Sequence, residues 1–234
     1  MNFYLLVEGD RTEKKLYPAW LSLTFATMRQ VWRIEDLQGD HFVVFAFKGQ
    51  PLTPDKLTRH VEDVVSLGRI DHFFVMVDAE EESSAVRQQS IDRIIRKIPG
   101  HDTIHYSIIV QNRCIETWFL GNRRFMKRNP QSEELRAYQN HYPVHEQDPE
   151  LMPKMANFTG THAGWHKKYL EAIFKEQNLT YNKEPYEVNK PSYFYQLYER
   201  VTSTPHLPSL KRLLDQWHGL GGTLPGYPAP SSPA

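Results

Sequence analysis

The chain has 234 residues, and its 28 Lys and Arg residues balance its 28 Asp and Glu residues. A net charge of zero excludes a strong overall attraction to nucleic acid or to a membrane surface, so any basic surface must be local. The apolar fraction of 40% is typical of a globular protein, and no segment has the character of a signal peptide or a membrane span. The single cysteine, Cys114, excludes an internal disulfide. We therefore expect a cytoplasmic protein without a membrane partner.

The first predicted element is a strand at Phe3 to Val7, closed by Glu8 and a glycine. An uninterrupted apolar run is typical of a strand buried on both faces of a parallel sheet. Such a strand delivers its last residue to the carboxyl edge of the sheet, where open α/β folds bind their ligands, which makes Glu8 a candidate metal ligand. Asp10 and Glu13 have the spacing of a capping box, and Pro18 is expected to kink or divide the helix that follows.

Three further apolar runs, separated by helical patterns, predict strands at 42–47, 73–77 and 104–110. Pro54 and Gly68 bound the first intervening helix, and a second helix ends before Pro99 with Val86, Ile91 and Ile95 on its inner face. Strands that alternate with helices favour a parallel sheet. We therefore predict an α/β core at residues 1–122, with a four-stranded parallel sheet flanked by helices.

The character of the sequence changes after residue 122. A basic stretch at 123–128 leads into a polar segment with one short helix expected at 133–140. Longer helices are predicted at 166–177, 192–202 and 209–217. We expect residues 123–218 to form a mostly helical extension packed on the core, and residues 219–234, rich in Gly and Pro, to be a disordered tail.

Acidic residues follow several of the predicted strands. Asp78 ends the third strand and should share the carboxyl edge with Glu8; Glu80 would point to the same side if the chain stays extended, and Glu116 follows the fourth strand. Converging carboxylates repel one another unless a cation is present, and oxygen ligands suit Mg²⁺ or Mn²⁺. A metal held there can activate water for phosphodiester hydrolysis. The alternative is that each acid caps a helix or lies in a solvated turn.

Two of these motifs together resemble the Toprim domain, the metal-binding module shared by topoisomerases, bacterial primases and nucleases of the overcoming-lysogenization-defect type. The first is Leu5-Leu6-Val7-Glu8-Gly9 with Thr12-Glu13 after it, and the second is Phe74-Val75-Met76-Val77-Asp78-Ala79-Glu80. The family usually has Asp-x-Asp in the second motif, whereas this chain has Glu80 as the second acid. The resemblance covers about residues 1–122.

A third stretch, Asn112-Arg113-Cys114-Ile115-Glu116-Thr117-Trp118-Phe119, resembles an Asn-x-Cys-x-Glu-x-Trp pattern in small Toprim-like proteins of bacterial defence loci, related to the RloB group. By that resemblance Glu116 is a third acid of the site. The alternative is that Glu116 caps a helix whose apolar residues pack in the core.

The resemblance implies a Mg²⁺- or Mn²⁺-dependent nuclease that cuts DNA or RNA in antiphage defence, working with an ABC-type ATPase. It implies metal ligation by Glu8, Asp78, Glu80 and Glu116, with Glu8, Asp78 and Glu116 also catalytic. In this family a lysine often assists the transition state, and the candidate is Lys190, with Lys48 and Arg113 as rivals. The oligomeric state stays open, a homodimer included.

Other motifs give weaker indications. His162 and His166 have the spacing of two metal ligands, but Gly164 argues against a helix there and we expect no zinc site. The chain has no Gly-rich phosphate loop. The basic stretch 123–128, with Lys167, Lys168 and the Tyr-rich segment 181–198, is a candidate nucleic-acid path; a solvated charged surface is the alternative.

Two rival functions are compatible with parts of this pattern. A catalytically degenerate Toprim module would serve as an interaction subunit. A receiver-like phosphoacceptor domain also has acids at strand ends, but it predicts a second acid beside Glu8 and a Lys after a fifth strand, whereas this chain has Gly9 and no evident fifth strand.

Overall fold

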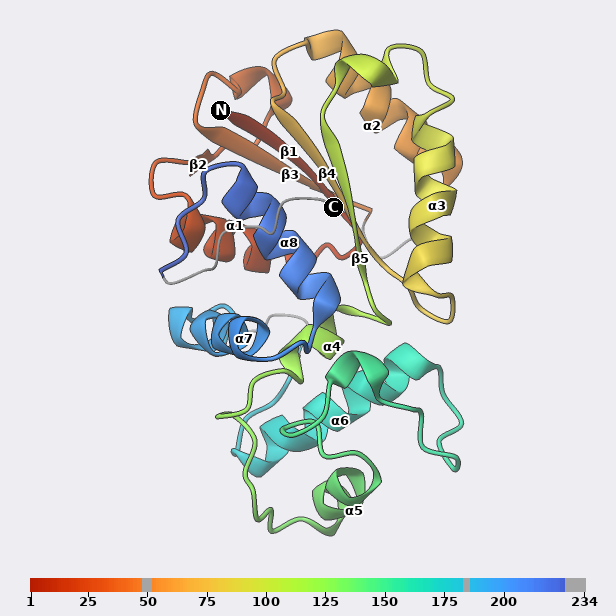
Figure 1. Ribbon diagram of the computed structural model, residues 1–234, viewed down its shortest axis with the longest axis vertical. Coiled ribbons are helices and arrows are strands. Elements are labelled where there is room, and N and C mark those ends of the chain that lie inside the picture. Colours follow the sequence, from red (N-terminus) through yellow and green to blue (C-terminus); the bar gives the residue numbers. More distant parts are fainter. Residues whose placement is uncertain (48–51, 183–185, 226–234) are drawn as a thin grey trace.

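The centre of the molecule is a sheet of five parallel strands in the order β2-β3-β1-β4-β5 (Figure 1). The computed structural model describes residues 1–47, 52–182 and 186–225. The strands are β1 (Asn2–Val7), β2 (Arg29–Gln30), β3 (His41–Ala46), β4 (His72–Asp78) and β5 (Tyr106–Gln111). The four predicted strands are present, but the predicted count of four is wrong. Sequence patterns miss β2 because it has only two residues, which pair with the start of β3.

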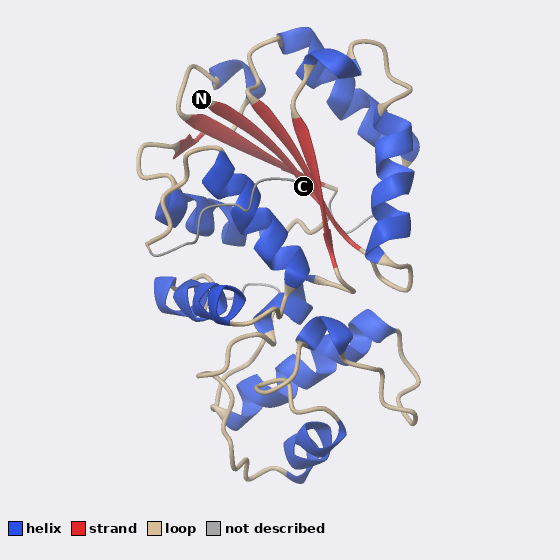
Figure 2. Ribbon diagram, viewed as in Figure 1, coloured by secondary structure: helices blue, strands red, loops and turns tan. Residues whose placement is uncertain are grey.

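The helices lie on both faces of the sheet and extend below it (Figure 2). They are α1 (Glu13–Thr24), α2 (Pro54–Leu67), α3 (Ser84–Ile95), α4 (Ile115–Phe119), α5 (Glu133–His141), α6 (His162–Glu176), α7 (Pro191–Ser203) and α8 (Pro208–Gly219). Three single 3₁₀ turns complete the described structure: η1 (Ile34–Asp36), η2 (His101–Thr103) and η3 (Pro149–Leu151).

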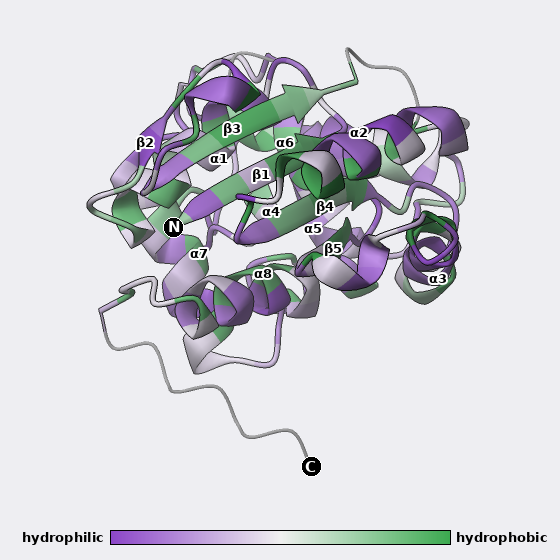
Figure 3. Ribbon diagram, turned by 90° about the horizontal axis from the view of Figure 1, so that it is seen from above, coloured by the Kyte–Doolittle hydropathy of each residue, from purple (hydrophilic) through white to green (hydrophobic). Residues whose placement is uncertain are grey.

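The central strand β1 divides the core into two layers, because successive side chains point to opposite faces. Phe3, Leu5 and Val7 join a cluster with α1 and the helices from α4 onward. Tyr4 and Leu6 join a second cluster with α2 and α3. Figure 3 shows the central strands coloured as predominantly hydrophobic. Burial on both faces explains why β1 reads as an unbroken apolar run.

The ends of α2 and α3 follow the sequence signals, because their capping residues lie next to the helix in the sequence. Thr53 caps α2 by accepting the N–H of Lys56, Pro54 occupies the first turn, and Gly68 ends the helix in the left-handed region at φ 57°. Ser83 caps α3 in the same way. The prediction that Val86 faces inward is wrong, because its side chain is exposed while Ile91 and Ile95 are buried.

Three local predictions are corrected by tertiary structure. Pro18 lies within α1, which continues unbroken to Thr24. The capping box is absent, since α1 begins at Glu13 itself. Gly164 does not prevent a helix at His162; its N–H donates to the side chain of Thr161, which caps α6.

The extension shares one continuous core with the sheet. Trp118 of α4 is fully buried, stacks on Trp20 of α1 with ring centroids 6.3 Å apart, and donates its indole N–H to Ser209 of α8 at 2.6 Å. The expected disorder from residue 219 does not hold at the start of the tail. Leu224 is buried, and the Thr223 N–H donates to the carbonyl of Thr24 at 2.8 Å. The rest of the predicted tail, 226–234, lies outside the described residues.

No helix in the part of the chain that the structure describes is long and apolar enough to cross a membrane.

Trp118→Ala is expected to destabilise the protein by about 3–5 kcal/mol, because it leaves a large cavity where α1, α4 and α8 meet. The free energy of unfolding in urea measures the effect. Trp32→Ala is the matched control, since Trp32 is 80% exposed, and should change stability by less than about 0.5 kcal/mol. Equal effects of the two substitutions would contradict a shared core.

Candidate functional site

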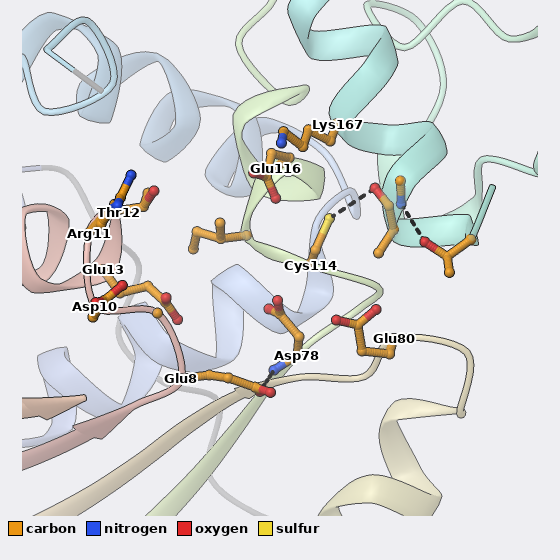
Figure 4. Close-up of a pocket in the computed structure, with 15 residues that line it drawn as sticks. Glu8, Asp10, Arg11, Thr12, Glu13, Asp78, Glu80, Cys114, Glu116 and Lys167 are labelled. Atoms are coloured by element: carbon orange, nitrogen blue, oxygen red, sulfur yellow. Dashed lines mark hydrogen bonds between the residues drawn. The ribbon is translucent and has the colours of Figure 1, made fainter. Parts of the chain in front are cut away.

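The site lies where β1 and β4 end side by side. These strands are parallel neighbours with Val7 opposite Met76, so Glu8 and Asp78 leave the sheet at the same edge. The Glu8 carboxylate turns toward the neighbouring strand, and its Oε2 accepts the backbone N–H of Asp78 at 3.0 Å (Figure 4). The predicted shared position of the two acids is therefore confirmed.

A cavity of about 340 Å³ opens at this edge and brings together segments far apart in the sequence. Its walls come from the β1–α1 turn, the end of β4, the start of α4 and the start of α6. The charged side chains that line it are Glu8, Asp10, Arg11, Glu13, Asp78, Glu80, Glu116 and Lys167. All four predicted acids, Glu8, Asp78, Glu80 and Glu116, thus border one pocket.

Glu13 is a further acid of the pocket, one that the sequence pattern did not assign to the site. It is the first residue of α1, is only 4% exposed and turns back toward Gly9, as side chains in a first helical turn do. A Cβ at position 9 would collide with Glu13 Oε2, so glycine there makes room for the carboxyl group. The available signal was a glutamate that follows Gly9 at the start of the helix, a position equally typical of a cap.

The surroundings of Glu13 disfavour the charged form of its carboxyl group. Burial raises its pKa from the ordinary 4.5 to about 8, and the carboxylates of Glu8 and Glu116 contribute to that rise. Its Oε1 is buried without a hydrogen-bond partner among the described residues. A buried acceptor without a partner costs free energy, and binding of a cation or a proton to this oxygen would remove that cost.

Asp78 is subject to the same forces. Its pKa is raised well above the usual 3.8. Burial is the largest cause, and repulsion by the neighbouring carboxylates adds to it, in decreasing order from Glu13, Glu8, Glu116 and Glu80. Tyr17, one helical turn beyond Glu13, also has a raised pKa, through burial and through the charges of Glu13 and Asp78. The titration of Asp78 therefore depends on the charge of Glu13.

Glu80 reaches the pocket by a turn, which corrects the expectation of an extended chain. Its φ is 53° and that of Arg113 is 73°, both in the left-handed region. Two hydrogen bonds join these residues. The Glu80 N–H donates to the Arg113 carbonyl at 2.9 Å, and Arg113 Nη1 donates to the Glu80 carbonyl at 3.0 Å. Such backbone strain costs about 1–3 kcal/mol per residue and clusters at functional sites.

Glu116 lies in the first turn of α4 and borders the cavity from the opposite side to Glu8 (Figure 4). Its Oε1 accepts the hydroxyl of Tyr181 at 3.0 Å. Tyr181 is buried and belongs to the Tyr-rich segment. This segment therefore contributes one hydrogen bond that holds the Glu116 carboxylate.

The predicted catalytic cation is not at the pocket. Lys190 pairs with Glu187 at 2.6 Å, lies over the ring of Tyr186 and is absent from the cavity lining. Of its two rivals, Arg113 donates to the backbone carbonyls of Glu80 and Glu82, and Lys48 lies outside the described residues. Lys167 of α6 instead borders the cavity, although the sequence placed it only on a nucleic-acid path.

The remaining basic candidates are divided between the pocket and the outer surface. Lys168 pairs with Glu134 at 3.4 Å, and Lys127 donates to the carbonyl of Glu176 at 2.8 Å. Neither lysine lines the pocket. These side chains therefore stabilise the extension in this structure, and the continuous basic path stays a prediction.

His162 and His166 face each other across one helical turn with ring centroids 5.0 Å apart. Both rings approach the same carbonyl, that of Met152, and His166 also bonds to Thr117 at 2.7 Å. Burial lowers the pKa of His166 to about 3, so it is neutral. Cys114 is buried with a raised pKa, as expected of a core thiol.

The donor set of the pocket is made of carboxylate oxygens, the ligands of hard divalent cations. Within residues 1–47, 52–182 and 186–225, however, no three His, Cys, Asp or Glu side chains are gathered around a single point as a metal would gather them. The residues suit such an ion because they are carboxylates whose charges are not balanced by cations. Their side chains are not already arranged around one point.

No protein-family model, curated protein or solved structure matches this chain. Its function must therefore be inferred from the geometry of the pocket.

The raised pKa values predict that the metal-free protein loses stability as pH rises from about 4.5 to about 8. Over this range folded Glu13 keeps a proton that the unfolded chain has released, so its favourable contribution is complete below pH 4.5 and disappears near pH 8. Glu13→Gln keeps the neutral form at every pH and should flatten the curve.

The measurement is the urea midpoint from pH 4.5 to pH 8.5 with a chelator present. Mg²⁺ added in excess of the chelator should restore stability to the unsubstituted chain at pH 8 by binding the folded state alone. Parallel curves for the chain and its Glu13→Gln variant would contradict the assignment of Glu13.

Proposed function

We propose that the chain is a Mg²⁺- or Mn²⁺-dependent nuclease that hydrolyses phosphodiester bonds in DNA or RNA. The observation that carries this proposal is the convergence of six carboxylates on one pocket, where burial and mutual repulsion raise the pKa values of Glu13 and Asp78. A site of uncompensated acids gains most from a divalent cation.

Glu8, Asp78 and Glu13 would hold the ion, with Glu80 and Glu116 completing the oxygen set. Because these side chains are not gathered in advance, binding would draw the longer glutamates inward. When bound, such an ion supplies a polarised water and neutralises charge that develops on the phosphoryl group. Lys167 replaces Lys190 in this proposal: its ammonium lies 3.8 Å from Glu171 on α6 but, unlike that of Lys190, belongs to a residue that borders the acidic pocket, where it would attract a phosphate oxygen.

The arrangement of the sheet supports the Toprim resemblance. β1 lies between β3 and β4, and the acids follow β1 and end β4, as the two motifs require. The setting implied by that resemblance, antiphage defence in the cytoplasm with an ABC-type ATPase partner, is part of the proposal. A chain without a P-loop motif of its own would depend on such a partner for ATP-driven control.

A second candidate is the degenerate Toprim module. It is favoured by the absence, within the described residues, of three acids gathered as metal ligands. The receiver-like alternative gains nothing from the fifth strand, because β2 is a two-residue edge strand and the residue beside Glu8 is glycine. Labelling of Asp78 by acetyl phosphate would favour the receiver.

Glu8→Gln and Asp78→Asn should each reduce metal-dependent cleavage by more than about 100-fold, because loss of a ligand exceeds the 10–100-fold cost of losing its supporting group. Cleavage is measured on plasmid, single-stranded DNA and total tRNA with Mg²⁺ or Mn²⁺, for the chain alone and with its candidate ATPase. Circular dichroism confirms folding. Unchanged biological activity of both variants would favour the interaction module.

Lys167→Ala should lower the cleavage rate by about 100- to 1,000-fold by removing a cation that stabilises the developing charge. Lys168→Ala is the matched control, since the two side chains are adjacent on α6 and 41% and 46% exposed, but only Lys167 borders the pocket. Lys190→Ala should also leave the rate unchanged. The reverse pattern, with loss only at Lys190, would restore the prediction made from the sequence.

A further inference from the structure

Gln111, a residue that no motif singles out, supports the pocket through Asp78, its neighbour in the sheet. It is the last residue of β5, its side chain is completely buried, and it stands opposite Asp78 in the parallel register of β4 and β5. Its own backbone carbonyl accepts the N–H of Ala79 at 2.9 Å, which fixes the chain just beyond Asp78. The buried amide is therefore held next to Asp78 at the end of the sheet.

One orientation of the Gln111 amide directs its nitrogen at the Tyr17 hydroxyl, 2.6 Å away, and its oxygen at Asp78 and the Val77 carbonyl, which are acceptors; the hydrogen bonds are complete only with the amide turned over. The nitrogen then donates to Asp78 Oδ1 and to the carbonyl of Val77 at 3.2 Å, and the oxygen accepts the hydroxyl of Tyr17 at 2.6 Å. Both donors and the acceptor are thus used. Tyr17 is also completely buried, so each partner would lose a bond that water cannot replace.

These contacts connect three elements of the site. Tyr17 belongs to α1, the helix that begins with Glu13, while Gln111 and Asp78 end neighbouring strands. An amide can donate to a carboxylate and accept from a phenol at the same time; a carboxylate in its place would repel Asp78, and an apolar side chain would leave both partners unpaired.

We propose that Gln111, oriented by Tyr17, is a positioning residue that fixes the Asp78 carboxylate for a divalent cation. The inference rests on the proposed function, since it assumes that Asp78 binds a metal. Gln111 engages Oδ1 from the core side and so leaves the rest of the carboxylate for the pocket. Supporting hydrogen bonds of this kind set ligand orientation and contribute about 10- to 100-fold to metal affinity.

The test is the dissociation constant of Mn²⁺, followed by the signal of free Mn²⁺ in electron paramagnetic resonance, with the full chain at fixed pH. Gln111→Met keeps the shape of the side chain and removes its hydrogen bonds, and should weaken Mn²⁺ binding by about 10- to 100-fold. Tyr17→Phe should weaken it in the same direction by less. The double variant should show less than the sum of the two effects, because the residues act in one network.

Ser107→Ala is the matched control, because Ser107 lies on the same strand and also makes side-chain hydrogen bonds, to His72 and Gln216, outside the pocket. It should leave Mn²⁺ affinity unchanged. A merely structural role for Gln111 would lower the unfolding midpoint of the metal-free variant and leave its Mn²⁺ affinity equal to that of the unsubstituted chain.

The outcomes separate the two proposals. Mn²⁺ binding that Asp78→Asn weakens but Gln111→Met and Tyr17→Phe do not would overturn the role of Gln111 and leave the nuclease proposal standing. If Gln111→Met fails to fold, the milder Tyr17→Phe decides by the same measurement. Absence of Mn²⁺ binding by the unsubstituted chain would overturn the nuclease proposal, and the inference with it.

Discussion

Repulsion between carboxylates at one edge of the sheet is the constraint on which this structure depends. Parallel strands deliver their ends to a common edge, so the acids after β1 and at the end of β4 cannot avoid each other. The chain then adds Glu13 from the first turn of α1 and Glu116 from α4. A fold selected for stability alone would not concentrate like charges in a partly buried cavity, and this cost is the physical reason to assign the pocket a function.

The surroundings of the acids hold them in place in spite of that repulsion. Gly9 makes room for the Glu13 carboxyl group, and the clasp between Arg113 and the Glu80 backbone keeps two left-handed residues in position. Tyr181 donates to Glu116 from the buried side. Each device acts on one acid, and together they keep the charges around the cavity instead of letting them turn into solvent.

The sheet and the positions of its end residues follow from short-range patterns. The apolar runs of β1, β3, β4 and β5 are buried on both faces, so Glu8 and Asp78 were predictable as neighbours. Glu13 and Lys167 were not, because their roles depend on how α1 and α6 pack against the sheet edge. Their own sequence neighbourhoods describe a helix start and a charged helix surface equally well. The sequence around Lys190 is compatible with a catalytic role, and its ion pair with Glu187 is a feature that only the folded chain shows.

The shared core of sheet and extension has a consequence for how this protein can be divided. Lys167 comes from the extension, whereas Glu8, Glu13 and Asp78 come from the first 78 residues, and Trp118 packs between these parts. A fragment cut after residue 122 would expose the apolar surface beneath α6 and α7 and lose one wall of the cavity. The smallest autonomous unit with a complete pocket therefore extends beyond the α/β portion, and the boundary drawn from motif resemblance is not a boundary for excision.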